Sequence, residues 1–133
     1  MERISTAIDP DIASALAEGF YPLPSGTSGE RFPVADVSMV SVTAPRPESD
    51  ADFLHALLEA IARIERRGFG AMASLGASEV CRVRTAGGGA RNDAWTSIRR
   101  RVLGVEVETA TQLEACHGAA RLAAMAAAGE IVS

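Results

Sequence analysis

The middle of the chain carries the clearest helical pattern. Ser49 and Asp52 make a capping-box pattern at its start. The apolar residues that follow share one helix face: Phe53, Leu54, Leu57, Leu58, Ile61 and Ile64. Gly68 is a candidate for the end of the helix, but Met72 and Leu75 continue a similar face, so an end near residue 75 is equally compatible. We expect the apolar stripe to pack on a sheet.

A strand and a helix flank three successive glycines in the second half of the chain. Residues Val80–Thr85 alternate in character and then meet Gly87–Gly89, which predicts a strand that enters a glycine turn. Asn92 or Asp93 can cap the helix that follows, and Gly104 predicts its end. The apolar side of this helix consists of Trp95, Ile98, Val102 and Leu103.

A second strand and a final helix complete the pattern. The strand is expected at Val105–Val107, and Thr111 with Glu114 forms another capping box for a helix from Gln112 towards Ala128. The apolar side of that helix is mostly small: Ala115, Gly118, Ala119, Leu122, Ala123 and Ala126. Small residues allow close approach to a sheet. The second half therefore predicts a β-α-β-α unit, with parallel strands covered by helices.

The first 47 residues have a weaker pattern. Apolar residues recur every fourth position at Ile4, Ile8, Ile12, Leu16 and Phe20. Pro10 interrupts this pattern, so we expect two short helical pieces. Residues 21–47 hold all but one of the six prolines, which predicts an extended loop with one short strand near Ser38–Thr43. A loop of this length needs either a function or support from a neighbouring surface.

Composition limits the class of protein. The chain has 133 residues, 47% hydrophobic and 23% charged, which fits one domain with a Pro/Gly-rich part over 1–47 and an α/β half over 48–133. The net charge is −4 and the thirteen basic residues, all Arg, are scattered, so no nucleic-acid partner is indicated. No apolar leader and no run of membrane-spanning length is visible, so we expect a soluble, cytoplasmic chain.

Other conspicuous residues favour structural interpretations. Cys81 and Cys116 have no metal-ligand spacing, and we expect them to be buried as small hydrophobic residues. His55 and His117 have no visible partner, so we assign no catalytic or metal role to either. The charge runs 99–101 and 65–67 are expected on solvated helix faces, with an interlobe or phosphate role as the alternative.

The triple glycine is the motif that points to chemistry. Without a Cβ the backbone can take positive φ and approach a ligand closely, while the free N–H groups of the next helix face an anion. A phosphate or nucleotide is the natural ligand, and a tight packing turn is the alternative. The motif matches neither of the common phosphate-loop signatures, GxxxxGK[ST] and GxGxxG.

A longer stretch resembles a known family. Val83–Trp95, followed by Leu103–Val107 and Glu114–Ala120, is similar to the C-terminal domain of the FGGY-family carbohydrate kinases. Phe20–Pro24 and Gly29–Val34, together with the helix segment Glu59–Glu65, look like its ribulokinase/xylulokinase-like branch. The resemblance covers nearly the whole chain.

The resemblance implies a partial actin-like, RNase H-like ATPase lobe of the α/β class. Gly88 and Gly89 would line the phosphates and ribose of ATP or ADP, and Asn92 or Asp93 would lie near the adenosine. Trp95 is expected to pack in the core. Mg²⁺ would accompany ATP in the complete enzyme, and the resemblance assigns no catalytic residue or metal ligand to this chain.

The rest of the family pattern has no counterpart here: a phosphate loop of Asp-x-Gly-Thr type, the catalytic Asp and most sugar contacts. Asp36-Val37 also stands where relatives usually carry Asp-Pro. We therefore expect a C-terminal fragment of an ATP-dependent sugar kinase, acting on a pentulose such as D-ribulose and inactive alone. The alternative is an interaction module that dimerises or complements a separately encoded N-terminal lobe as a split kinase.

Overall fold

The long helix predicted from the sequence is α2, which spans Asp50–Ser74 in the computed structural model. The structure describes residues 5–111 and 115–128. The Ser49 hydroxyl accepts a hydrogen bond from the Asp52 amide at 3.2 Å, as the capping pattern predicts. The helix continues through Gly68, where a Cβ would lie 3.0 Å from the Phe32 ring. Glycine there makes room for a loop side chain and does not end the helix.

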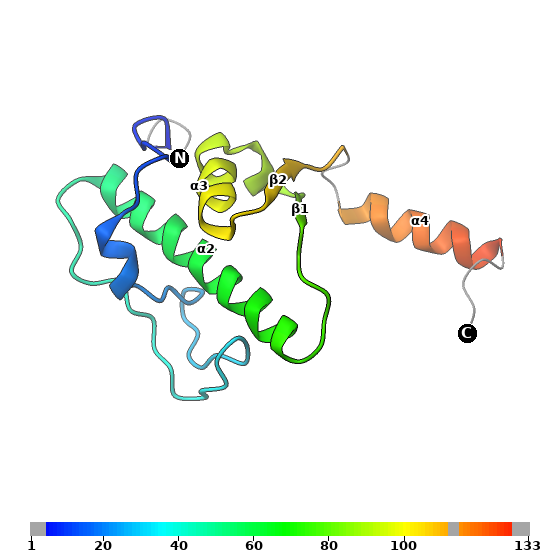
Figure 1. Ribbon diagram of the computed structural model, residues 1–133, viewed down its shortest axis with the longest axis horizontal. Coiled ribbons are helices and arrows are strands. Elements are labelled where there is room, and N and C mark those ends of the chain that lie inside the picture. The colour runs from blue at the N-terminus through cyan, green and yellow to red at the C-terminus, as the bar shows by residue number, and fades with distance from the viewer. Residues whose placement is uncertain (1–4, 112–114, 129–133) are drawn as a thin grey trace.

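The second half contains the predicted parallel α/β unit (Figure 1). Strand β1 (Arg82–Thr85) pairs in parallel with β2 (Glu106–Thr109). Helix α3 (Asp93–Leu103) connects them, after the 3₁₀ turn η2 (Gly88–Arg91). The first strand begins two residues later than predicted and the second is shifted towards its C-terminal side. Asn92 caps α3 and Gly104, at φ 71°, ends it, so both terminal signals are confirmed.

The final helix, α4 (Ala115–Ala127), does not cover the sheet. Its side chains from Cys116 onward are exposed, and Figure 1 shows the helix extending away from the rest of the chain. The predicted packing on the sheet is therefore wrong for α4. Its small side chains offer little apolar area, so their burial would add little free energy. The expected capping residue Glu114 and the expected first residue Gln112 lie outside the described residues.

The N-terminal third is mostly irregular. Within the described part of its predicted helical pattern, the 3₁₀ helix η1 (Ala15–Gly19) is a regular element, and Ile4 lies outside the described residues. The predicted strand near 38–43 is reduced to an isolated antiparallel bridge between Tyr21 and Val42. The Leu23 amide, which would make the next bond of that ladder, donates instead to the Ser41 hydroxyl at 3.1 Å, so the pairing does not extend.

Helix α2 packs against α3 and η1, so the expectation that its apolar stripe faces the sheet is wrong. Its most deeply buried apolar positions are the small residues Ala56, Ala60 and Ala62, whereas Ile61 is 41% exposed. Ala62 shares a core cluster with Ile98 and Val102 of α3, together with Ile8. Ala56 and Ala60 share a second cluster with Ala17 and Phe20. Small residues allow the neighbouring segments to approach the helix axis closely.

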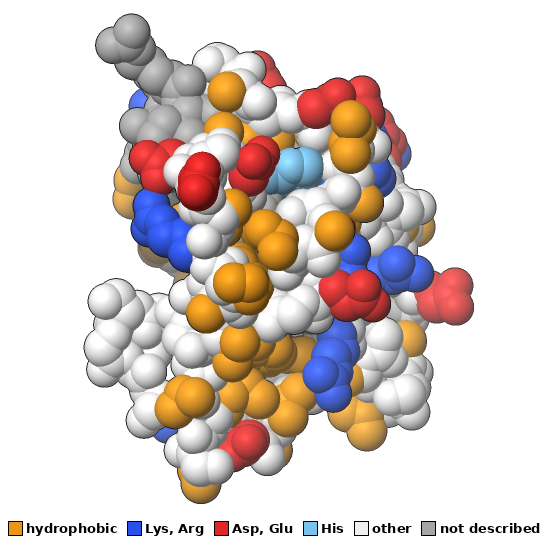
Figure 2. All heavy atoms as spheres, turned by 90° about the vertical axis from the view of Figure 1, so that its left-hand side faces the viewer, with side chains coloured by type: hydrophobic (Ala, Val, Ile, Leu, Met, Phe, Trp, Pro, Cys, Tyr) orange, Lys and Arg blue, Asp and Glu red, His pale blue; other side chains and the backbone are white. Residues whose placement is uncertain are grey.

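The surface mixes charge and apolar groups. On the face drawn in Figure 2, basic and acidic side chains are interspersed and hydrophobic ones lie between them. Cys81 and Cys116 are exposed, so the expectation that both are buried is wrong. Cys81 precedes β1 at the end of the connection from α2, and Cys116 lies on α4. Neither position faces a core. Within the described residues, no helix is both long and apolar enough to cross a membrane.

Candidate functional site

A groove of about 610 Å³ lies beside the glycine turn. One wall comes from the N-terminal segment and the other from η2 and the first turns of α3. The lining residues are Ser5, Thr6, Ile8 and Pro10 on the first wall, and Gly88, Arg91, Asn92, Asp93, Ala94 and Ser97 on the second. The structure thus brings together three of the four residues expected at a nucleotide site. Gly89 is not among the lining residues.

The three glycines have different roles. Gly87 takes a φ of +79° and turns the chain out of β1, as expected of a turn glycine. A Cβ on Gly88 would meet no atom within 4 Å, so the space next to this groove-lining residue is open. A Cβ on Gly89 would lie 3.6 Å from the Trp95 ring. The positive φ therefore belongs to Gly87, and Gly89 faces Trp95.

The first turn of α3 forms the edge of the groove. The Asn92 side-chain oxygen accepts a hydrogen bond from the Trp95 amide at 3.1 Å. This bond satisfies one of the free amides of the helix end and leaves the NH₂ group of the Asn92 side chain for other partners. Trp95 itself is half-buried against the core, as expected. Asn92 therefore has a structural role at the start of α3, and it also lines the groove.

Arg99 contradicts the prediction of a solvated arginine run. Its side chain is 8% exposed and pairs with Glu65 of α2. It also donates to the Thr85 hydroxyl at the end of β1, and its guanidinium lies 5.2 Å from the Trp95 ring centroid. The residue ties α2 and α3 to the strand that leads into the glycine turn. The same contact makes Glu65 half-buried, so the expectation for run 65–67 fails at its first residue.

The other two arginines of the run also have partners. Arg100 donates to the Val107 carbonyl at 2.9 Å, and Arg101 donates to the Pro10 carbonyl at 2.8 Å. Arg101 also pairs with Glu59 at 2.7 Å. Arg100 remains exposed, so the prediction of a solvated face holds for it, whereas Arg101 is only partly exposed because Pro10 and Glu59 accept its hydrogen bonds. Sequence spacing alone carries no signal for these partners.

His55 and Glu59 are neighbouring titratable groups whose pKa values are both lowered. Burial lowers the pKa of the His55 imidazole below its usual value, and the charge on Glu59 offsets only part of this effect. Burial alone would raise the pKa of the Glu59 carboxyl, but hydrogen bonds from Arg101, Ser14 and Arg63 outweigh it and lower the pKa. His55 is thus partly buried beside a carboxylate, whereas His117 is exposed on α4.

The described residues provide no metal centre of their own. Within 5–111 and 115–128, no group of three or more His, Cys, Asp or Glu side chains is arranged to hold a metal ion.

The fold and the groove define the class. A parallel β-α-β unit with a glycine turn at the carboxyl end of its first strand, opening on a groove, is an α/β domain suited to holding a ligand at that turn. The chain belongs to the FGGY family of carbohydrate kinases, because the family model for the C-terminal domain matches residues 8–127. This match confirms the resemblance to the C-terminal domain of the family, and the ribulokinase/xylulokinase-like branch stays a prediction. The family's actin-like, RNase H-like fold is compatible with the parallel unit observed here.

The sequence missed one wall of the groove. Ser5, Thr6, Ile8 and Pro10 carried no chemical motif, and only the apolar spacing of Ile8 suggested burial. Ile8 is indeed 8% exposed and packs on α3. The glycine motif could be recognised in the sequence because its residues are adjacent. The opposite wall could not, because it is formed by a segment about 80 residues away that meets the motif only in the folded chain.

Proposed function

We propose that this chain supplies part of the ATP site of a carbohydrate kinase, and that the groove beside the glycine turn receives the nucleotide. The observation that carries the proposal is the open backbone at Gly88 on the wall of a groove of about 610 Å³. Small-molecule sites commonly have volumes of about 300–1,000 Å³. Family membership supports ATP as the phosphate donor.

The lining groups suit the parts of a nucleotide. The missing side chain at Gly88 allows phosphate oxygens to approach the backbone, and Arg91 offers a positive charge to them. The Asn92 amide and the Asp93 carboxylate suit ribose hydroxyls or the adenine edge, since they offer donors and acceptors side by side. We keep Gly89 in the proposed site as a second backbone position next to the phosphates, although its nearest neighbour in the structure is Trp95.

Turnover needs more than this groove. Phosphoryl transfer requires a positioned base and a clamp on the transferred phosphate. The 133 residues hold no Asp-x-Gly-Thr loop, so we propose that these groups come from another part of the kinase and that this chain alone does not phosphorylate sugar. The proposed substrate is a pentulose such as D-ribulose, on the resemblance of residues 20–24 and 29–34. No lining residue of the groove comes from those segments.

One observation favours the alternative of an interaction module. Parallel sheets are normally covered on both faces, and α4, the element expected to cover this one, has exposed side chains that include Leu122 at 61% and Met125 at 37%. For an interaction module that complements a separately encoded lobe, co-expression with an N-terminal kinase lobe should give a stable complex with sugar-kinase activity. Sedimentation of the chain alone distinguishes a homodimer from a monomer that needs the other lobe.

A pair of variants tests nucleotide binding. Gly88→Leu adds bulk at a groove-lining position where a Cβ would meet no atom within 4 Å, so the fold should remain while ADP binding is lost. Gly118→Leu on exposed α4 is the matched control, because a Cβ there also meets nothing within 4 Å. Ligand-observed NMR should give a millimolar Kd for ADP, about −4 kcal/mol, for the wild-type chain and the control only. Equal ADP binding by both variants would refute the proposal.

A further inference from the structure

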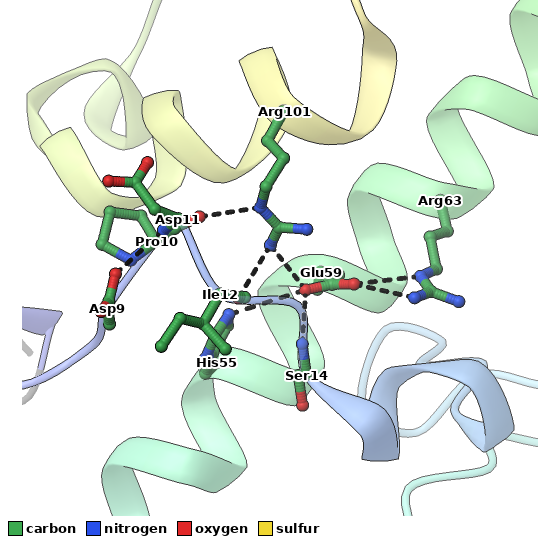
Figure 3. A network of polar contacts seen from close by, with 9 residues as sticks. All are labelled: Asp9, Pro10, Asp11, Ile12, Ser14, His55, Glu59, Arg63 and Arg101. Carbon is green, nitrogen blue, oxygen red and sulfur yellow. Dashed lines mark hydrogen bonds and ion pairs between the residues drawn. The ribbon is translucent and has the colours of Figure 1, made fainter.

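A buried carboxylate joins three segments of the chain. Figure 3 shows Glu59 of α2 between Arg101 of α3 and Arg63 of its own helix, with the Ser14 amide directed at the same carboxylate. One oxygen accepts from Ser14 N at 2.9 Å and from Arg101 Nη2 at 2.7 Å. The other oxygen accepts from Arg63 Nε and Nη2 at 3.2 and 2.9 Å. Glu59 is 0% exposed, so its charge depends on these partners.

Arg101 also holds the N-terminal segment directly. Its Nε donates to the Pro10 carbonyl at 2.8 Å and its Nη2 to the Ile12 carbonyl at 3.2 Å. With the Glu59 bond, one guanidinium therefore serves three acceptors, and its fixed fork makes this possible. Ser14, held by Glu59, lies at the end of the same stretch. Residues 10–14 are thus fastened to α2 and α3 by polar contacts at several points.

The fastened stretch carries one wall of the groove. Pro10 lines the groove itself, and the segment before it supplies Ser5, Thr6 and Ile8. Ile8 is anchored separately, by packing against Ile98 and Val102. Neither Glu59 nor Arg101 lines the groove. Any effect of these two residues on a ligand there must therefore pass through the position of residues 5–10.

We infer that Arg101 and Glu59 are positioning residues, which set the affinity of the groove for a nucleoside diphosphate by fixing its N-terminal wall. The inference rests on the proposed nucleotide site and deepens it. Arg63 is the comparison residue, because it supports Glu59 without holding the N-terminal wall of the groove. It shares the same carboxylate, but among the described residues its hydrogen bonds go to Glu59 of its own helix and not to the N-terminal segment. Loss of Arg63 weakens the pairing of Glu59 and leaves the contacts to Pro10 and Ile12 in place.

The test compares Arg101→Lys with Arg63→Gln in the full chain. Lysine keeps the charge beside Glu59 but cannot serve three acceptors from one planar group. We expect Arg101→Lys to raise the ADP Kd at least about fivefold, the lower end of ordinary coupling between linked sites, and Arg63→Gln to leave it within about twofold. Protein-observed NMR measures the Kd on folded molecules, so a loss of stability does not imitate the effect.

A second readout needs no ligand. The amides of Ile8 and Ile12 donate to Ser5 and Asp9 carbonyls at 3.3 and 3.4 Å. Their hydrogen exchange should accelerate about tenfold in Arg101→Lys and remain near the wild-type rate in Arg63→Gln. Unchanged exchange in Arg101→Lys, or the same ADP Kd in both variants, would overturn the positioning role. A wild-type chain that binds no ADP would instead overturn the proposed function, which separates the two failures.

Discussion

Replacing Arg99 by methionine should cost more stability than any other single change in the arginine run. The side chain is 8% exposed and pairs with Glu65, itself 24% exposed, while also donating to the Thr85 hydroxyl. Methionine keeps the apolar stem, so the change removes the charge and little packing. Breaking a buried ion pair usually costs about 3–5 kcal/mol. Because Glu65 can regain water, we expect the lower end, about 3 kcal/mol.

Urea denaturation measures this loss. With a slope of about 2 kcal/mol per molar urea, a loss of about 3 kcal/mol lowers the midpoint by about 1.5 M. The matched control is Arg84→Met, whose pair with Glu108 joins side chains that are 68% and 36% exposed. Such exposed pairs are screened by water, so the control midpoint should not move measurably. Similar midpoints for both variants would show that Arg99 behaves as the surface residue that the sequence suggested.

Four further predictions concern the glycine turn, the two shifted titratable groups and the activity of the chain. Gly87→Ala places a Cβ at φ +79° and should lower the free energy of unfolding by about 1–2 kcal/mol, measured by thermal unfolding. Gly70→Ala in α2 should instead raise it by up to about 1 kcal/mol. A larger loss of stability for Gly70→Ala than for Gly87→Ala would contradict the turn geometry. Because the pKa of His55 is lowered from 6.5, the unfolded state takes up its proton first. Stability should therefore fall as the pH drops from about 7 to 5, and His55→Gln should flatten that step. The lowered pKa of Glu59 adds a second loss below about pH 5, which Glu59→Gln removes; a flat pH profile for the wild type would refute both. Finally, the chain with ATP, Mg²⁺ and D-ribulose should form no sugar phosphate above a no-enzyme blank, and a rate above the blank would refute the need for other kinase parts.

Local signals in the sequence predicted the elements well. Ser49, Asn92 and Gly104 each act on backbone groups within a few residues, so their effect does not depend on the rest of the fold. The parallel pairing of the strands also followed from local information, since a helix of this length between two short strands requires a crossover. These features placed the glycine turn correctly between β1 and α3.

Tertiary partners could not be predicted in the same way. Arg99 and Arg101 looked like solvated charges because their partners, Glu65 and Glu59, are 34 and 42 residues away. The wall formed by residues 5–10 was missed for the same reason. The stripe of α2 was assigned to the wrong neighbour, since amphipathic spacing identifies a buried face and does not identify the surface that covers it.

Chemical-shift mapping with ADP tests the nucleotide groove most directly. The backbone amide resonances of the wild-type chain are followed during titration with ADP to several millimolar. The account predicts saturable shifts confined to residues 87–97 and 5–10, the opposite walls of the groove, with a Kd in the millimolar range. Shifts that are absent at that concentration, or that centre on the arginines Arg63 and Arg66 outside the groove, would contradict it.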